Sequence, residues 1–175
     1  KKYYFDANGV MQTGWFKIDN ADYYATSSGA INAQWVGSGN NWYYVDADGK
    51  MVTGFQTIAG AKYYFAESGL MQTGWFKING EDYYAASSGA IQAQWVKSLS
   101  NWYYVNDEGL ILTGDQVING RQYYFNEDGI MYTGWMQVGN QWKYYSQGTL
   151  KIYGKTFVDG EKVTGWLPLG NRWYY

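Results

Sequence analysis

Four places in the sequence carry two tryptophans seven residues apart, a residue type and spacing suited to holding a cation or a sugar. An indole ring presents a negatively polarised face to a positive group, and the same flat face packs against the C–H side of a sugar. Neither interaction requires an ionisable side chain, and the chain contains no His and no Cys. The four pairs are Trp35 with Trp42, Trp95 with Trp102, Trp135 with Trp142, and Trp166 with Trp173.

The composition excludes several functional classes. Aromatic residues make up 21% of the 175 residues. The absence of Cys rules out disulfides and thiolate metal sites. The formal net charge of −2 argues against nucleic acid as a partner, because such proteins carry a basic patch. The sequence also has no apolar run long enough to insert into a membrane.

Catalysis is not expected of this segment. The usual acid–base and nucleophilic groups, His and Cys, are missing, and the carboxylates recur with the repeats or lie in turns, whereas a catalytic pair is singular. The stretch Asp46-Ala47-Asp48-Gly49 resembles part of a calcium loop, but the rest of that loop is missing and turn chemistry explains these residues. We therefore expect no cofactor and no metal, and any catalytic domain would lie outside this segment.

Repetition is the strongest signal in the chain. Between Tyr3 and Tyr123, Tyr-Tyr pairs begin every 20 residues, and the next two pairs begin at Tyr144 and Tyr174. The octapeptide "MQTGWFKI" occurs twice, 60 residues apart. Such regularity is typical of repeat proteins. We expect residues 1–175 to form one repeat-array binding module and, since the chain starts and stops at a Tyr-Tyr pair, to be a piece of a longer protein.

Each repeat is predicted to form a β-hairpin. Asn79-Gly80 is a strong two-residue turn signal because both central residues of such a turn need positive φ. This turn places Lys77 opposite Asp82 and Trp75 opposite Tyr84. A two-stranded hairpin is not stable alone. The fold predicted is therefore an all-β solenoid of stacked hairpins of about 20 residues, with one longer repeat near the C-terminus.

The register sorts each hairpin into two faces. Val36 and Val45 lie on the face that we assign to the core, and the two tryptophans of a pair are diagonal neighbours on the other face. An adjoining aromatic residue would complete a three-sided box. The alternative is that these rings only fill space between repeats.

Two repeats carry an aspartate in place of the second tryptophan. Asp22 and Asp82 are predicted to lie opposite Lys17 and Lys77. The simpler interpretation is a cross-strand ion pair that contributes little to stability. The other interpretation is a carboxylate that accepts hydrogen bonds from sugar hydroxyls. In the repeats that carry Phe55 with Lys62, and Asp115 with Gln122, we expect the box to be absent or degraded.

Three stretches, "TGWFKINGEDYY", "QWVGSGNNWYYVDADGKMVTGF" and "TGWMQVGNQWKYYSQG", resemble the choline-binding, or cell-wall-binding, repeat. This resemblance covers almost the whole chain. It implies a β-solenoid in which choline groups of teichoic acids sit between consecutive hairpins, each held by two Trp of one repeat and an aromatic residue of the next. It also implies a secreted, cell-wall-associated protein.

Carried over residue by residue, the resemblance implies two complete boxes and two further candidates. Face parity selects the tyrosine that closes each complete box. Trp135 with Trp142 is the third candidate, and Trp166 with Trp173 lies at the chain end, where its closing partner is in doubt. The complete boxes are Trp35, Trp42 and Tyr64, and Trp95, Trp102 and Tyr124.

The resemblance leaves alternatives for the ligand. The same superfamily contains glucan-binding repeats of streptococcal glucosyltransferases and receptor-binding repeats of clostridial toxins, and "KYYFAESGLMQTGWFKINGEDYY" looks as much like those. The expected partner is thus a choline-decorated cell-wall polymer or a glycan, and a purely structural spacer is the third hypothesis. Homodimerisation through the terminal repeats is a further option.

Overall fold

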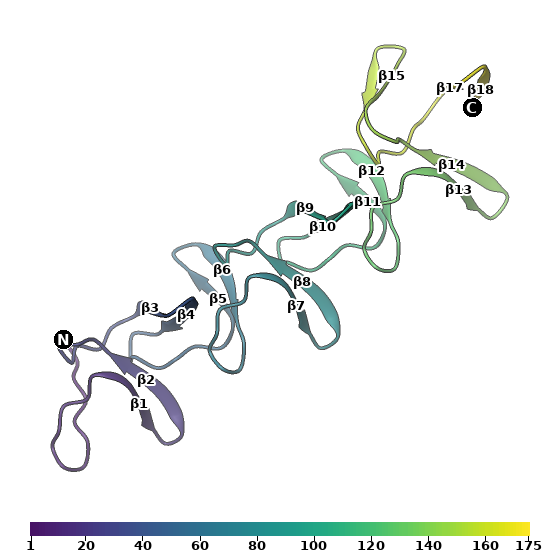
Figure 1. Cartoon of the computed structure of the whole chain (residues 1–175). Helices are drawn as coiled ribbons and strands as arrows, with labels where there is room; N and C mark the ends of the chain where they lie inside the picture. Colours follow the sequence, from purple (N-terminus) through teal and green to yellow (C-terminus); the bar gives the residue numbers. More distant parts are fainter. The chain divides into compact units, whose positions relative to one another are not determined.

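The computed structural model describes all residues 1–175 and consists of strands joined by turns (Figure 1). Every strand belongs to a two-stranded antiparallel hairpin. The chain contains no helix of the length and apolarity needed to cross a membrane. It divides into two compact units, Lys1–Gln92 and Ala93–Tyr175. The prediction of an all-β array of hairpin repeats is confirmed.

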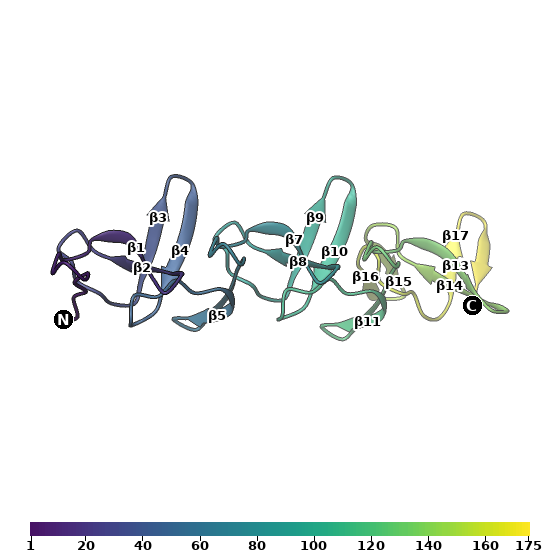
Figure 2. The same cartoon turned by 90° about the horizontal axis from the view of Figure 1, so that it is seen from below.

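The first unit holds four hairpins that follow one another in chain order (Figure 1). All eight strands are five residues long, and Figure 2 shows β3 and β4 side by side. The hairpins are β1 (Gly14–Ile18) with β2 (Ala21–Ala25), β3 (Gln34–Ser38) with β4 (Asn41–Val45), β5 (Gly54–Ile58) with β6 (Ala61–Phe65), and β7 (Gly74–Ile78) with β8 (Glu81–Ala85).

The second unit holds five hairpins, of which the last two have strands of only three residues. They are β9 (Gln94–Ser98) with β10 (Asn101–Val105), β11 (Gly114–Ile118) with β12 (Arg121–Phe125), β13 (Gly134–Val138) with β14 (Gln141–Tyr145), β15 (Leu150–Ile152) with β16 (Lys155–Phe157), and β17 (Leu167–Leu169) with β18 (Arg172–Tyr174).

The turn residues set the register that the sequence predicts. Asn79 and Gly80 have φ of 52° and 89°, the positive values that a tight two-residue turn demands. Trp75 therefore lies opposite Tyr84, and Lys77 lies opposite Asp82. Because side chains alternate across a strand, this register decides which rings share a face.

Neighbouring hairpins are joined by backbone hydrogen bonds and by a periodic buried position. In the first unit the Tyr24 N–H on β2 donates to the Gly49 carbonyl over 2.8 Å. This bond connects the first hairpin to the turn that follows the second hairpin. The last residue of each long second strand is fully buried, as the core assignment of Val45 predicts. These buried residues are Ala25, Val45, Phe65 and Ala85 in the first unit, and Val105, Phe125 and Tyr145 in the second.

The longer repeat near the C-terminus arises from an insertion into a turn. Gly89 N–H donates to the Ala86 carbonyl to close an ordinary turn, and Gly160 N–H donates to the Ser146 carbonyl in the same way, both over 2.8 Å. Residues 147–157, which form β15 and β16, are thus inserted between two halves of a turn that still closes. The turn keeps its geometry but acquires new residues.

Two glycines of these turns make room for a methionine. Gly89 has φ of +82°, and a Cβ atom there would clash with the Met71 sulfur. Gly160 has the same relation to Met131. Each glycine is therefore required both for its backbone conformation and for the close approach of a side chain.

The Gly89→Ala variant should lower the free energy of unfolding by about 1–3 kcal/mol, because it adds a clash with Met71 to the strain of positive φ. Gly80→Ala is the matched control, since Gly80 has φ of +89° and open space around the Cβ position. Urea unfolding curves of both variants measure the difference. Equal decreases in the free energy of unfolding would show that Met71 moves away from the added Cβ atom without loss of stability.

Tyr145 connects the core of the second unit to a carboxylate. Its side chain is fully buried, and its hydroxyl donates to Asp115 Oδ1 over 3.3 Å. Burial, followed by the charge and hydrogen bond of Asp115, raises the pKa of Tyr145 to about 12. The folded protein therefore holds this phenolic proton more tightly than the unfolded chain does.

This shift predicts a loss of stability at high pH. Since the folded pKa lies above the unfolded value of 10.0, the contribution is complete below pH 10 and disappears as the pH rises to about 12. Denaturant unfolding between pH 9 and 12 should show a shallower decline for Tyr145→Phe than for the parent chain. The exposed Tyr153 provides the control, since Tyr153→Phe should leave the decline unchanged.

Candidate functional site

The first tryptophan pair lies on one hairpin of the first unit. Trp35 on β3 is half-buried and Trp42 on β4 is 48% exposed. Trp42 pairs with Gly37, two residues beyond Trp35, so the indoles are diagonal neighbours. Their ring centroids lie 6.5 Å apart at an interplanar angle of 83°. The predicted placement of the two indoles on one face of the hairpin is confirmed. This face is not wholly turned away from the core, because Trp35 also lies 5.9 Å from the fully buried Phe65.

The ring that closes this pair is Tyr63, whereas face parity predicted Tyr64. Tyr63 on β6 lies 5.0 Å from Trp35 between ring centroids, at 72°. Tyr64 instead stacks on Phe76 at 5.3 Å and 10°. The parity argument failed because Tyr63 and Phe65, which share one face of β6, are the rings that contact Trp35. Parity within one hairpin cannot reveal which face of the next hairpin it meets.

Met71 forms a further wall that the sequence analysis missed. Its N–H donates to the Trp42 carbonyl over 2.9 Å, which fixes the residue beside the indole. A cavity of about 400 Å³ lies between Trp35, Trp42, Tyr63 and Met71, with Ser87 and Ser88 at its rim. The signal was available in the repeated "MQTGW" stretches, where the methionine recurs with the same period as the tryptophan.

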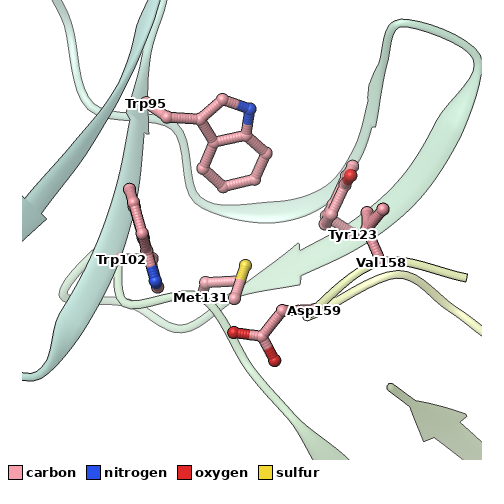
Figure 3. A pocket seen from close by; sticks show the side chains of 6 residues that line it. All are labelled: Trp95, Trp102, Tyr123, Met131, Val158 and Asp159. Atoms are coloured by element: carbon pink, nitrogen blue, oxygen red, sulfur yellow. The ribbon is translucent and has the colours of Figure 1, made fainter. Parts of the chain in front are cut away.

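The second unit contains an equivalent pocket (Figure 3). Trp95 on β9 and Trp102 on β10 lie 6.4 Å apart at 89°, and Tyr123 on β12 lies 5.0 Å from Trp95. Met131 again stands beside the second tryptophan, and the cavity measures about 350 Å³. Tyr124, the residue that parity selected, contacts Tyr132 at 6.2 Å instead.

A third pocket surrounds Trp135 and Trp142, whose centroids lie 6.4 Å apart at 87°. Tyr174 lies 5.0 Å from Trp135, and Tyr175 completes a cavity of about 580 Å³. Trp142 is 61% exposed, so this pocket is the most open of the three at its second indole.

The fourth predicted pair is arranged differently. Trp166 lies 5.1 Å from Tyr175, and Trp173 stacks on Tyr153 at 6.0 Å and 23°. Both indoles are more than half exposed. These two tryptophans contact different rings and do not form a three-sided box of the kind seen in the other pairs.

Repeats without the second tryptophan use charged side chains at the equivalent place. Lys77 Nζ lies 2.7 Å from Asp82 Oδ1, and Lys17 lies at the same distance from Asp22. The cross-strand ion pairs are thus present. At the repeat of Phe55, the ammonium of Lys62 lies over the ring at 5.0 Å from its centroid.

The repeat that begins at Asp115 replaces the aromatic contact by charge. Lys143 Nζ lies 3.7 Å from Asp115 Oδ2, and the buried Tyr145 donates to the other oxygen of the same carboxylate. Asp115 thus has a cation and a hydroxyl as partners where the other repeats have aromatic rings. This repeat lacks the two-indole arrangement, as the sequence predicts.

The aspartate-rich turn shows ordinary turn chemistry. Asp46 Oδ1 accepts hydrogen bonds from the N–H groups of Asp48 and Lys50, over 2.8 and 3.0 Å. The carboxylate therefore stabilises the turn by capping backbone donors, as the turn interpretation of this stretch predicts.

The three pockets share a chemistry of aromatic faces with few polar atoms. Two perpendicular indoles and a tyrosine ring surround a space suited to a compact group that carries positive charge but donates no hydrogen bond. Burial, and then the charge of Glu161, raises the pKa of Tyr123 above its usual value. The walls of the three pockets are mainly aromatic rings, together with Met71 and Met131 in two of them.

Family models match the chain along most of its length. A choline-binding repeat model matches residues 1–35, 52–94 and 112–157. A cell wall binding repeat model matches residues 34–51 and 94–111. The chain belongs to the choline-binding repeat family. Repeats of this family are typically non-catalytic and occur in cell-surface-associated proteins. A comparison of the sequence with curated proteins found no match.

Solved choline-binding proteins share the fold of this choline-binding repeat array. CbpJ from Streptococcus pneumoniae TIGR4 is 32% identical with a TM-score of 0.68, over 92% of this chain and 61% of that protein. Choline binding protein F from Streptococcus pneumoniae is 33% identical with the same TM-score, over 93% and 61%. The chain thus spans about three fifths of the length of these two proteins.

The choline-binding domain of CbpL from Streptococcus pneumoniae is also similar. It is 28% identical with a TM-score of 0.59, over 87% of this chain and 78% of that domain. The similarity therefore extends to an isolated domain of the family as well as to longer proteins.

Tyr63, and not Tyr64, is the tyrosine that contacts Trp35 in the first-unit pocket. Tyr63→Leu should weaken binding of tetramethylammonium at the first-unit pocket by about three- to tenfold, because one cation–π contact is lost. Tyr64→Leu, which removes a ring directed at Phe76, should change it less than twofold. Quenching of indole fluorescence during titration measures both. A larger effect of Tyr64→Leu would contradict the observed geometry.

Proposed function

We propose that the chain is a non-catalytic binding module that recognises choline groups of teichoic or lipoteichoic acids on a Gram-positive cell surface. The choline groups would occupy the three pockets built by Trp35 and Trp42, Trp95 and Trp102, and Trp135 and Trp142. Tyr63, Tyr123 and Tyr174 would supply the third ring of each. The protein would be secreted and associated with the cell wall.

The observation that carries this proposal is the exposure of paired indoles beside a cavity. Trp42 and Trp142 are 48% and 61% exposed, although burying a tryptophan would stabilise the fold. A spacer whose rings only fill space would bury them. Retained exposure at the same place in two of the three repeats is expected of a ligand site, and the third indole at this place, Trp102, is partly exposed.

The expected affinity of one pocket is low, and the repetition compensates for it. A ring contributes about 0.5–2 kcal/mol to binding of a cation. Three rings, less the cost of ordering the ligand, correspond to a Kd of about 1 mM. The second unit alone carries two pockets, and a polymer that engages both would gain about 10²–10⁴ in avidity.

Relatives support a cell-wall ligand. Choline binding protein F from Streptococcus pneumoniae was solved in the presence of a peptidoglycan analogue and, in another structure, in complex with ipratropium. The three pockets of this chain would be suited to the quaternary ammonium of choline because they offer aromatic faces and few hydrogen-bonding groups.

A glycan is the second candidate ligand, and one observation favours it. Tyr153 and Trp173 stack at 23° and are 76% and 56% exposed, so they present a flat aromatic surface outside the three pockets. Such a platform suits the C–H face of a sugar. Glucan or host glycan binding would then add to, or replace, choline recognition.

Competition separates these functions. The chain should bind a tertiary-amine resin and be eluted by free choline, while dextran resin should not retain it. Trp42→Ala and Trp102→Ala should each weaken retention more than Trp15→Ala. The second-tryptophan position of the Trp15 repeat is occupied by Asp22, whose carboxylate pairs with Lys17. Retention on dextran with indifference to choline would select the glycan function, and equal losses in all three variants would contradict the pocket assignment.

A further inference from the structure

The Trp35–Trp42 and Trp95–Trp102 pockets differ at one wall. In the first unit the rim consists of Ser87 and Ser88, whereas in the second unit the same place is taken by Val158 and Asp159. The equivalence follows from the turns, because Gly89 and Gly160 close them with the same hydrogen bond and each adjoins the pocket methionine. The rim of the first-unit pocket is thus neutral, whereas the rim of the second-unit pocket carries a carboxylate.

The Asp159 carboxylate is held in position. The Gly148 N–H donates to Asp159 Oδ1 over 2.7 Å, and the other oxygen accepts no hydrogen bond within the protein. In Figure 3 the carboxylate lies beside Met131, across the pocket from the Trp95 indole. One oxygen is therefore left to interact with a ligand.

The segment that carries Asp159, directly after the inserted residues, is itself anchored. Arg121 on β12 forms an ion pair with Glu161, and Glu161 Oε2 accepts a hydrogen bond from the Val158 N–H over 2.9 Å. The Arg121 guanidinium also donates to the Thr156 carbonyl over 3.2 Å. These contacts fix the segment on both sides of Asp159, so a ligand would not have to order it.

Two other charged groups bear on this pocket, the Arg121–Glu161 ion pair and the Lys97 ammonium, and only Lys97 opposes the charge of Asp159. Glu161 is neutralised by Arg121. Lys97 carries its ammonium 5.4 Å from the Trp102 ring centroid and opposes a cationic ligand, whereas Trp42 in the first unit faces Gly37. Without Asp159 the local charge of the second-unit pocket would be positive.

We infer that Asp159 is a specificity-determining residue, which makes the Trp95–Trp102 pocket select a cation over a neutral ligand of the same shape. This inference rests on the proposed function, because it assigns a charge preference to one of the proposed choline pockets. It also makes the pockets unequal. The first-unit pocket would discriminate by aromatic faces alone, and the second-unit pocket by aromatic faces and a fixed carboxylate.

Indole N–H signals in an NMR titration of the full chain test this inference, because Trp42 and Trp102 report on the two pockets in one sample. The ligands are choline and its neutral isostere 3,3-dimethyl-1-butanol. Asp159→Asn, which retains an oxygen to accept the Gly148 hydrogen bond, should weaken choline binding at Trp102 by about three- to tenfold. It should leave the isostere at Trp102, and choline at Trp42, unchanged.

Two further variants complete the design. Ser88→Asp should strengthen choline binding at Trp42, because it introduces the missing carboxylate into the first-unit pocket. Asp128→Asn is the charge-matched control, since it removes an exposed carboxylate of the second unit that does not line the Trp95–Trp102 pocket. This control should leave both pockets unchanged.

The outcomes separate the inference from the function. Choline binding at Trp102 that is unaffected by Asp159→Asn overturns the inference and leaves the proposed function intact. Equal weakening of choline and the isostere also overturns it, because the role would then be one of shape. Absence of any choline response at both indoles in the parent chain overturns the proposed function and the inference with it.

Discussion

The contact on which the structure depends is the edge-on meeting of an aromatic ring on one hairpin with a tyrosine on the next. Trp35 meets Tyr63 at 5.0 Å in the first unit, and Trp95 meets Tyr123 at the same distance in the second. A two-stranded hairpin cannot bury enough surface to be stable alone. The inter-hairpin ring contact therefore stabilises the array, and the same contact leaves one face of the indole open toward a pocket.

Site and scaffold are consequently the same set of residues. The methionine beside each pocket is fixed by its backbone hydrogen bond to the carbonyl of the second tryptophan, as in Met71 and Trp42. The glycine of a later turn makes room for that methionine. A pocket thus draws on three successive hairpins. Short repeats can therefore form a pocket from neighbouring hairpins.

The repeat also tolerates replacement of the aromatic residue at the first-tryptophan position. At Asp115 the indole is replaced by a carboxylate that pairs with Lys143 and accepts a hydrogen bond from Tyr145, and the hairpin keeps its register. In the C-terminal repeat an insertion enters a turn without opening it, and Asp159 in the second half of that turn lines a pocket. Sequence variation in the array therefore changes the chemistry of single sites and leaves the scaffold intact.

By itself the sequence determined the hairpins, their register and the pairing of the indoles. Asn-Gly turns and period-two alternation act within one repeat, so Trp35 and Trp42 could be placed together from spacing alone. Only the tertiary structure decided that Tyr63 and Met71 complete the pocket and that Asp159 lies at the rim of another. Those contacts join different hairpins. Which faces of two hairpins meet depends on packing between repeats, and no pattern within one repeat encodes it.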